Sequence, residues 1–271
     1  MKRRFAKLLL GVVALSAVSA CQTVQTTGGG EVGVDRSQMM MVSSQEIEQA
    51  SGQQYQQVLS EARKKGALNR DAAQLFRVRA ISNRLIPQSV AFRKDASRWQ
   101  WEVNVISSDE LNAWCMAGGK MAIYSGLIDQ LRLTDDEIAA VMGHEIAHAL
   151  REHSREQVSK AMVTSMGASV AGALLGIGEL GQDLMSMVGK VTFELPNSRL
   201  HETEADRIGV ELAARAGYDP RAAVRLWDKM AGRSAGGPPQ WLSTHPAHDS
   251  RRKDLGEYAE RVMPLFEQAR R

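Results

Sequence analysis

Apolar and polar positions follow a helical period over most of the chain and a strand period over one short stretch. The pattern over residues 43–65 opens with a capping box formed by Ser43 and Glu46, which predicts the start of a helix. A second apolar stripe predicts another helix over about residues 70–87, where a proline ends the pattern. Residues 43–87 are therefore expected to form two helices.

The strand period lies between residues 99 and 124. Residues 99–106 alternate between apolar and polar side chains, which is typical of a half-buried strand. Residues 111–117 and 120–124 flank Gly118-Gly119, the pattern of a β-hairpin. The sequence thus predicts a small antiparallel sheet that separates the N-terminal helices from the second half of the chain.

The second half returns to the helical period. Thr134 and Glu137 form another capping box, and the apolar pattern that follows continues to Leu150. Residues 161–178 carry no charge, which predicts a packed or mobile helix beside the functional site, with a membrane helix as the alternative. Further helices are predicted from Ser198 to about Gly217, from Asp219-Pro220, and at the C-terminus after a loop over residues 232–247.

The helix over residues 134–150 carries the motif H-E-x-x-H at His144, Glu145 and His148. Histidines at positions i and i+4 lie on one face of a helix, so both imidazoles can reach one tetrahedral Zn²⁺. Glu145 lies about 100° round the helix axis, where it can act as a general base beside the metal. The motif therefore predicts a catalytic zinc site.

A catalytic zinc needs a third protein ligand. The metzincin arrangement is excluded because Arg151 and Ser154 stand where that motif requires glycine and histidine. In the acidic helix after residue 198, Glu202 and Asp206 are four residues apart and share a face. We assign Glu202 to the metal and Asp206 to the orientation of a ligating histidine, whereas Glu204 points away and is expected to be a solvated surface charge.

The N-terminus has the features of a secreted, lipid-anchored protein. Residues 1–20 combine a basic start with a short apolar run, which predicts a signal peptide. Cys21 follows Val-Ser-Ala and resembles the lipidated cysteine of bacterial lipoproteins, and the residue after it, not being aspartate, favours the outer membrane facing the periplasm. Residues 21–43 are expected to be the lipidated cysteine and a flexible tether, and residues 44–271 a single domain.

Composition excludes several classes of protein. The chain has 34 basic and 31 acidic residues, but four of the basic ones lie in the first seven positions, so the remainder is nearly neutral and a nucleic-acid partner is not expected. Two cysteines among 271 residues exclude a disulfide-stapled scaffold. Cys115 is expected to be a small buried hydrophobic residue.

The H-E-x-x-H motif together with S-R-x-x-E-x-E-A-D at residues 198–206 resembles the zinc metallopeptidase family of CAAX prenyl proteases and HtpX, in particular its compact bacterial lipoprotein members. The resemblance extends over about residues 75–255, and its further matches are Asn112-Ala113, Gly118-Gly119, Gly126-Leu127, Thr244-His245-Pro246 and Arg251. The chain lacks the transmembrane helices of the membrane-embedded relatives, so prenylated substrates are not expected.

This resemblance implies a mostly helical α+β fold of the gluzincin-like zincin type, with one Zn²⁺ per chain. It implies Glu202 as the third ligand beside His144 and His148, in agreement with the helix-face argument. It also implies that His245 stabilises the tetrahedral intermediate and that Arg251 supports that region of the site.

We therefore expect a zinc endopeptidase in which Glu145 is the general base. The strand around Trp114, Met116, Ala117 and Gly118 is expected to bind an extended substrate by edge pairing, with core packing as the alternative for Trp114 and Met116. Backbone-led binding suits unfolded or damaged envelope proteins, so quality control of the envelope is the expected role.

Two other functions stay open from the sequence. The first is a latent protease that acts mainly as an envelope chaperone or assembly factor, with residues 155–197 covering the zinc. The second is a zinc hydrolase of small substrates. The expected partners are unfolded polypeptides and the membrane, through lipid on Cys21; the sequence does not determine the oligomeric state.

Overall fold

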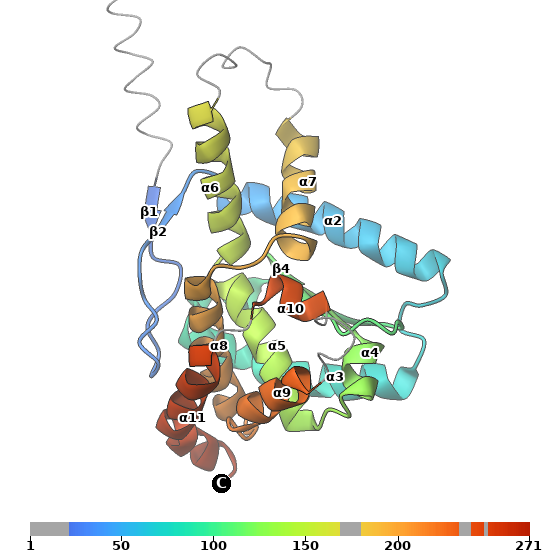
Figure 1. Cartoon of the computed structure of the whole chain (residues 1–271), viewed down its shortest axis with the longest axis vertical. Helices are drawn as coiled ribbons and strands as arrows, with labels where there is room; N and C mark the ends of the chain where they lie inside the picture. The colour runs from blue at the N-terminus through green and yellow to red at the C-terminus, as the bar shows by residue number, and fades with distance from the viewer. Residues whose placement is uncertain (1–21, 169–179, 233–239, 247–248) are drawn as a thin grey trace, which may run out of the picture.

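The computed structural model describes residues 22–168, 180–232, 240–246 and 249–271 (Figure 1). Helices make up most of this part of the chain, and a three-stranded sheet packs beside the central helix α5 (Asp135–Leu150). The predicted mostly helical α+β fold class is confirmed. The predicted signal peptide (1–20) and Cys21 lie outside the described residues.

Both predicted capping boxes are present. Ser43 and Glu46 cap α2, and Thr134 and Glu137 cap α5. Ser198 caps α8 by accepting a hydrogen bond from the backbone of His201. The helices are α2 (Ser44–Lys64), α3 (Ala72–Leu85), α4 (Ser125–Gln130), α5, α6 (His153–Ala168), α7 (Leu180–Phe193), α8 (Arg199–Arg215), α9 (Ala222–Ala231), α10 (Gln240–Thr244) and α11 (Asp249–Ala269), with 3₁₀ turns over Ile86–Ala91 and Lys94–Arg98.

The sheet consists of β3 (Glu102–Ile106), β4 (Ala113–Met116) and β5 (Lys120–Tyr124) in the order β3-β5-β4. The predicted hairpin is confirmed, because β4 and β5 pair antiparallel. The prediction of an antiparallel sheet is wrong in one respect: β3 pairs parallel to β5, since the chain passes β3 and returns with β5 between the other two strands.

The prediction that β3 is half-buried is also wrong, because four of its five residues are buried. Val103 and Val105 join the main core with α3, while Ile106 packs beneath α2. The polar residue between them, Asn104, donates a hydrogen bond to the hydroxyl of Tyr55 on α2, at 2.6 Å. Alternation in this strand therefore marks one buried polar contact instead of a solvated face.

The prediction of a flexible tether over residues 22–43 is wrong. Strands β1 (Gln22–Val24) and β2 (Gln38–Met40) pair antiparallel, and the valines of the intervening loop are buried. The N-terminal segment, defined here as residues 22–43, therefore belongs to the domain. The sequence does not reveal this structure, because the few apolar side chains of the segment are spaced irregularly among glycines and threonines and pack against distant elements.

Helices α5 and α8 cross with their backbones in contact at Gly143 and Gly209. A Cβ added at Gly209 would lie 2.7 Å from the backbone nitrogen of His144, and one added at Gly143 would lie 2.8 Å from the carbonyl oxygen of Gly209. Only glycine permits this approach. The crossing brings the acidic first turns of α8 directly beside the histidines of α5.

Helices α6 and α7 stand side by side on the same side of the molecule as β1 and β2, with α7 packed on α2 (Figure 1). The uncharged stretch 161–178 begins in α6, and its residues 169–178 lie outside the described part of the chain. Among the described residues, no helix is both long and apolar enough to span a membrane.

Candidate metal centre

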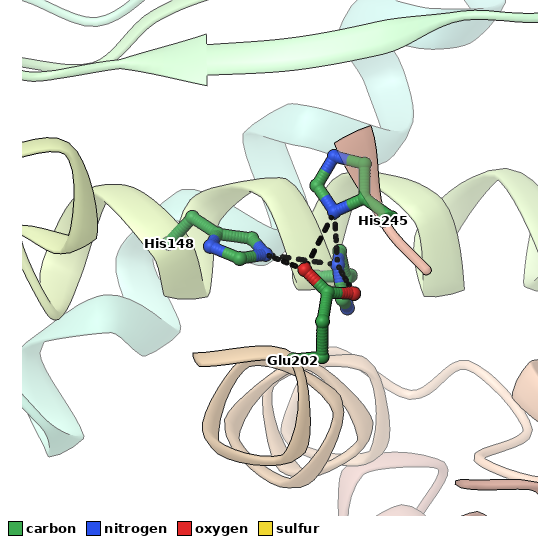
Figure 2. Close-up of side chains that lie close together, drawn as sticks. His148, Glu202 and His245 are labelled. Carbon is green, nitrogen blue, oxygen red and sulfur yellow. Dashed lines mark hydrogen bonds and ion pairs between the residues drawn. The ribbon is translucent and has the colours of Figure 1, made fainter. Parts of the chain in front are cut away.

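Three predicted ligands from two helices converge on one point. His144 projects from α5. Figure 2 shows His148 on the same helix and Glu202 projecting from α8 toward it. The Nε2 atoms of the two histidines are 3.0 Å apart. One carboxylate oxygen of Glu202 lies 3.6 Å from Nε2 of His144, and the other lies 3.4 Å from Nε2 of His148. All three residues are buried.

His144 is oriented by Asp206. Its Nδ1 donates a hydrogen bond to Oδ1 of Asp206 at 3.0 Å, and Arg251 binds both oxygens of the same carboxylate at 2.7 Å. Burial opposes ionisation of Asp206, but Arg251 and His144 hold the pKa of the carboxyl below its ordinary value. Because an ionised carboxylate only accepts, His144 carries its proton on Nδ1 and leaves the Nε2 lone pair facing the centre of the cluster.

The donor set fits a divalent metal such as Zn²⁺. The bare Nε2 of His144 faces the Nε2 of His148 and a carboxylate, an arrangement of lone pairs and negative charge that favours a cation. Burial lowers the pKa of His148 to about 4, so at neutral pH the ring is in the uncharged form that a metal ligand requires. His144, His148 and Glu202 are therefore the residues that would hold the metal.

Arg251 also supports Glu202. Its Nη1 lies 2.7 Å from Oε2 of Glu202. Burial opposes ionisation of Glu202, but the neighbouring histidines, His245 first, hold the pKa of this carboxyl well below its ordinary range. Glu202 is thus an anionic donor at neutral pH. The structure brings Asp206 and Arg251 to the supporting positions expected from the sequence.

Glu145, the predicted general base, lies beside the cluster and is buried. The indole nitrogen of Trp241 donates a hydrogen bond to its Oε1 at 2.7 Å, and Nε2 of His245 is 3.5 Å from the same oxygen. Both contacts come from α10 and the residues just after it. The sequence predicts a loop over residues 232–247 and does not single out Trp241, although its spacing of four residues from His245 is that of one helical turn.

His245 lies inside the cluster. Its Nδ1 is 3.2 Å from Nε2 of His144 and 3.0 Å from Oε1 of Glu202, and its ring stacks on Trp241 at 4.7 Å (Figure 2). His245 and the three predicted ligands all offer donor atoms within 4.8 Å of one another. With His245 in this position, four protein donors surround the metal position, whereas a catalytic zinc keeps one place for water.

The expectation that Glu204 is a solvated surface charge is wrong. The side chain is only 6% exposed, forms ion pairs with Arg36 and Arg151, and is hydrogen-bonded to His153. Arg36 comes from the N-terminal segment and Arg151 from the residue after α5, so the partners lie far apart in the sequence. Helix periodicity gave the direction of Glu204 correctly, but it could not show what covers that face.

Two further histidines were missed by sequence analysis. His153 Nδ1 lies 2.9 Å from Nδ1 of His148, and the ring of His153 stacks on His201 with centroids 4.3 Å apart. Burial, together with the positive charges around it, lowers the pKa of His153 well below its ordinary value. The signal in the sequence is their position beside the two motifs: His153 lies five residues after His148, and His201 directly precedes Glu202.

The predicted substrate-binding strand has its two large side chains in the core. Trp114 and Met116 pack with Tyr55 beneath α2, so the alternative of core packing is the one found for their side chains. β4 is an edge strand next to α5, and Ala117 and Gly118 follow it in the turn to β5. Edge pairing through the backbone of β4 stays a prediction.

Cys115 is fully buried on β4, as expected for a small hydrophobic residue. Burial raises the pKa of its thiol well above the ordinary value, with a further contribution from the charge of Glu145. The thiol is therefore protonated at neutral pH.

Comparisons with a family model and with known proteins all point to peptidases. The model of peptidase family M48 matches residues 73–259. The chain is 31% identical over 243 residues to the mitochondrial metalloendopeptidase OMA1 of Bos taurus. These residues cover 84% of this chain and 45% of that protein. It is 30% identical over 202 residues to the beta-barrel assembly-enhancing protease of Yersinia pestis (69% of this chain, 39% of that protein).

A relative of similar length is the metalloprotease LoiP of Escherichia coli, 26% identical over 252 residues, which cover 92% of this chain and 94% of LoiP. The chain spans half or less of the length of the mitochondrial relatives named OMA1 from cattle, Arabidopsis thaliana and Saccharomyces cerevisiae.

Proposed function

The chain belongs to peptidase family M48, and on this premise we propose that it is a zinc-dependent endopeptidase that hydrolyses unfolded or damaged proteins of the bacterial cell envelope. The single observation that carries the proposal is the convergence of His144, His148 and Glu202 on one buried point with Glu145 beside it. This combination of ligands and a flanking carboxylate is that of zinc peptidases.

His144, His148 and Glu202 would hold a zinc ion, which would supply Lewis acidity at the scissile carbonyl. Glu145 accepts a proton from the attacking water molecule and returns it to the leaving amine. Trp241 holds one oxygen of Glu145, so the other oxygen is left for this proton transfer. Asp206 and Arg251 keep His144 and Glu202 in the orientation that binds the metal.

An extended polypeptide is the proposed substrate. β4 is the edge strand of the described sheet and lies next to α5, so a substrate strand that pairs with its backbone would run past the metal ligands. Backbone pairing accepts many side chains, which suits unfolded proteins. An envelope location with lipid on Cys21 rests on the leader sequence.

The proposal is tested with an unfolded protein such as reduced casein, incubated with the zinc-loaded chain and with its Glu145→Gln variant. The parent is expected to cleave, and the variant is expected to bind zinc equally well but not to cleave. Removal of zinc with a chelator should abolish cleavage by the parent. If both proteins bind zinc and neither cleaves, the protein is not an endopeptidase that is active at rest, and the second candidate below is favoured.

The position of His245 favours a second candidate, a protease that is latent at rest. With His245 among the ligands, the place needed for a water molecule is taken. His245→Ala separates the two roles of this residue. An increase in casein cleavage would support a closed resting state, whereas a decrease would support the role of His245 in stabilising the tetrahedral intermediate.

A further inference from the structure

The two histidine ligands are supported in different ways. His144 donates directly from Nδ1 to the carboxylate of Asp206. Among the described residues, no carboxylate contacts Nδ1 of His148, which instead lies 2.9 Å from Nδ1 of His153. Ligating histidines commonly have their second nitrogen bound to an acceptor that fixes both the tautomer and the ring orientation. Support of His148 must therefore pass through a second imidazole.

The other ring nitrogen of His153 contacts a carboxylate. Its Nε2 lies 3.0 Å from Oε2 of Glu204, which is flanked by Arg36 and Arg151. A carboxylate between two arginines is ionised and can only accept hydrogen bonds. His153 therefore holds its proton on Nε2, and its Nδ1 is an acceptor.

This tautomer fixes that of His148. Because Nδ1 of His153 accepts, Nδ1 of His148 must be the donor in their 2.9 Å contact, which leaves Nε2 of His148 without a proton. Nε2 is the atom that faces His144 and Glu202. Each ring carries one proton, each N–H has an acceptor, and the free lone pair points at the metal position.

We propose that His153 and Glu204 are positioning residues for the metal ligand His148, and that Arg151 and Arg36 hold Glu204 in place for this purpose. The N-terminal segment thereby becomes a part of the metal site through Arg36. The inference rests on the proposed function, since it takes His148 as a ligand of a catalytic metal.

A second cation is not needed to explain this cluster. Glu204 and the neighbouring Glu156 carry two negative charges, and Arg36 and Arg151 supply two positive charges within hydrogen-bond distance. Nor does stability explain it well, because buried ion pairs contribute little compared with apolar packing. A positioning role does explain why His153 links Glu204 to Nδ1 of His148.

The test measures the zinc dissociation constant of the full chain by competition with a chromophoric chelator. His153→Phe keeps the stacking on His201 but removes both nitrogens, and Glu204→Gln removes the anion. Each is expected to weaken zinc binding about 10- to 100-fold, the usual effect of losing such an outer partner.

Two matched variants control for general damage. His201→Phe changes the other ring of the stacked pair and removes its contact with Glu156, but it leaves His153 and Glu204 unchanged. Glu211→Gln removes a fully buried carboxylate on the same helix, which contacts Arg215 and the backbone of Val32 in the N-terminal segment but no histidine. Both controls are expected to bind zinc as the parent does. The proposal is overturned if Glu204→Gln and Glu211→Gln weaken binding equally, or if His153→Phe binds like the parent.

A measurement on the parent keeps the test valid if a variant does not fold. Nitrogen NMR of the zinc-loaded chain should show a proton on Nδ1 of His148 and on Nε2 of His153; a proton on Nδ1 of His153 overturns the proposal. A parent that binds no zinc would overturn the proposed function as well, whereas a parent that binds zinc with the opposite His153 tautomer overturns this inference alone.

Discussion

The indole nitrogen of Trp241 lies 2.7 Å from Oε1 of Glu145 and donates a hydrogen bond to it. Trp241 is almost completely buried, and the segment that carries it also carries His245. The general base is therefore held by a short helix that is distant in sequence from the H-E-x-x-H motif. Any displacement of α10 would affect the base and the fourth donor together.

Trp241→Phe is expected to lower the rate of peptide hydrolysis about 10-fold, because it removes a hydrogen bond to a charged group worth about 1.5 kcal/mol while keeping an aromatic ring. Zinc affinity should not change, since phenylalanine keeps an aromatic ring against His144 and His245. Rates with unfolded casein and chelator competition measure the two effects. Trp99→Phe, a partly buried tryptophan at the edge of the core, is the control and should keep the parental rate. A parental rate in Trp241→Phe would show that this hydrogen bond does not orient the base.

Gly209→Ala is expected to destabilise the protein by at least the usual cost of overpacking, about 1–3 kcal/mol, because the new Cβ would meet the backbone of α5 at 2.7 Å. It should also weaken zinc binding, since α8 must move and carries Glu202 with it. Urea denaturation and chelator competition test both effects. Gly52→Ala, in α2, adds a Cβ with nothing within 4 Å and should be neutral or stabilising. Equal effects of the two substitutions would contradict the role of the helix crossing.

Arg36→Gln is expected to lower the free energy of unfolding by about 1–3 kcal/mol, because it leaves Glu204 and Glu156 without one of their charged partners in a buried setting. The control is Arg77→Gln, whose partner Asp135 is 61% exposed, and where a change of at most about 1 kcal/mol is expected. Denaturation midpoints compare the two variants. If Arg36→Gln has no larger effect than the control, the N-terminal segment does not contribute to the domain through this residue.

Stability of the metal-free protein is expected to fall as the pH falls below about 4.5, partly because of Glu156. Burial opposes ionisation of this carboxyl, but hydrogen bonds from His201, Arg36, Lys160 and Gln38 hold its pKa far below the ordinary value of 4.5. A depressed folded-state pKa stabilises the fold fully above the unfolded value, and the contribution is lost as the pH falls toward the folded one.

Urea denaturation between pH 7 and pH 3 measures this dependence. Glu156→Gln should reduce the slope of stability against pH in the acidic range without removing it, because Asp206 also has a lowered pKa in the fold. An unchanged slope would mean that Glu156 gains no stabilisation from its ionised form.

Local geometry explains what could be predicted. Capping boxes begin helices through contacts three residues apart, so α2 and α5 were placed correctly. The same helical spacing put His144 and His148 on one face and Glu202 and Asp206 on another, because positions four apart in a helix face the same way whatever surrounds them.

Packing against distant elements explains what could not be predicted from the sequence. Glu204 faces away from Glu202 as its position requires, but that face is covered by Arg36 from the N-terminal segment, some 170 residues earlier. Trp114 lies on the predicted edge strand, but its side chain points beneath α2. Whether a charge or an aromatic ring is exposed depends on which distant element packs over it, and no local pattern contains that information.

By itself, then, the sequence determined the catalytic helix, the three metal ligands as a candidate set and the class of chemistry, because these follow from residue type and helical period. The tertiary structure decided how the ligands are held: the close crossing at Gly143 and Gly209, the entry of Trp241 and His245 from α10, and the burial of the N-terminal segment. Each of these depends on backbones or side chains that meet only when the chain has folded, with burial supplying the free energy that holds them together.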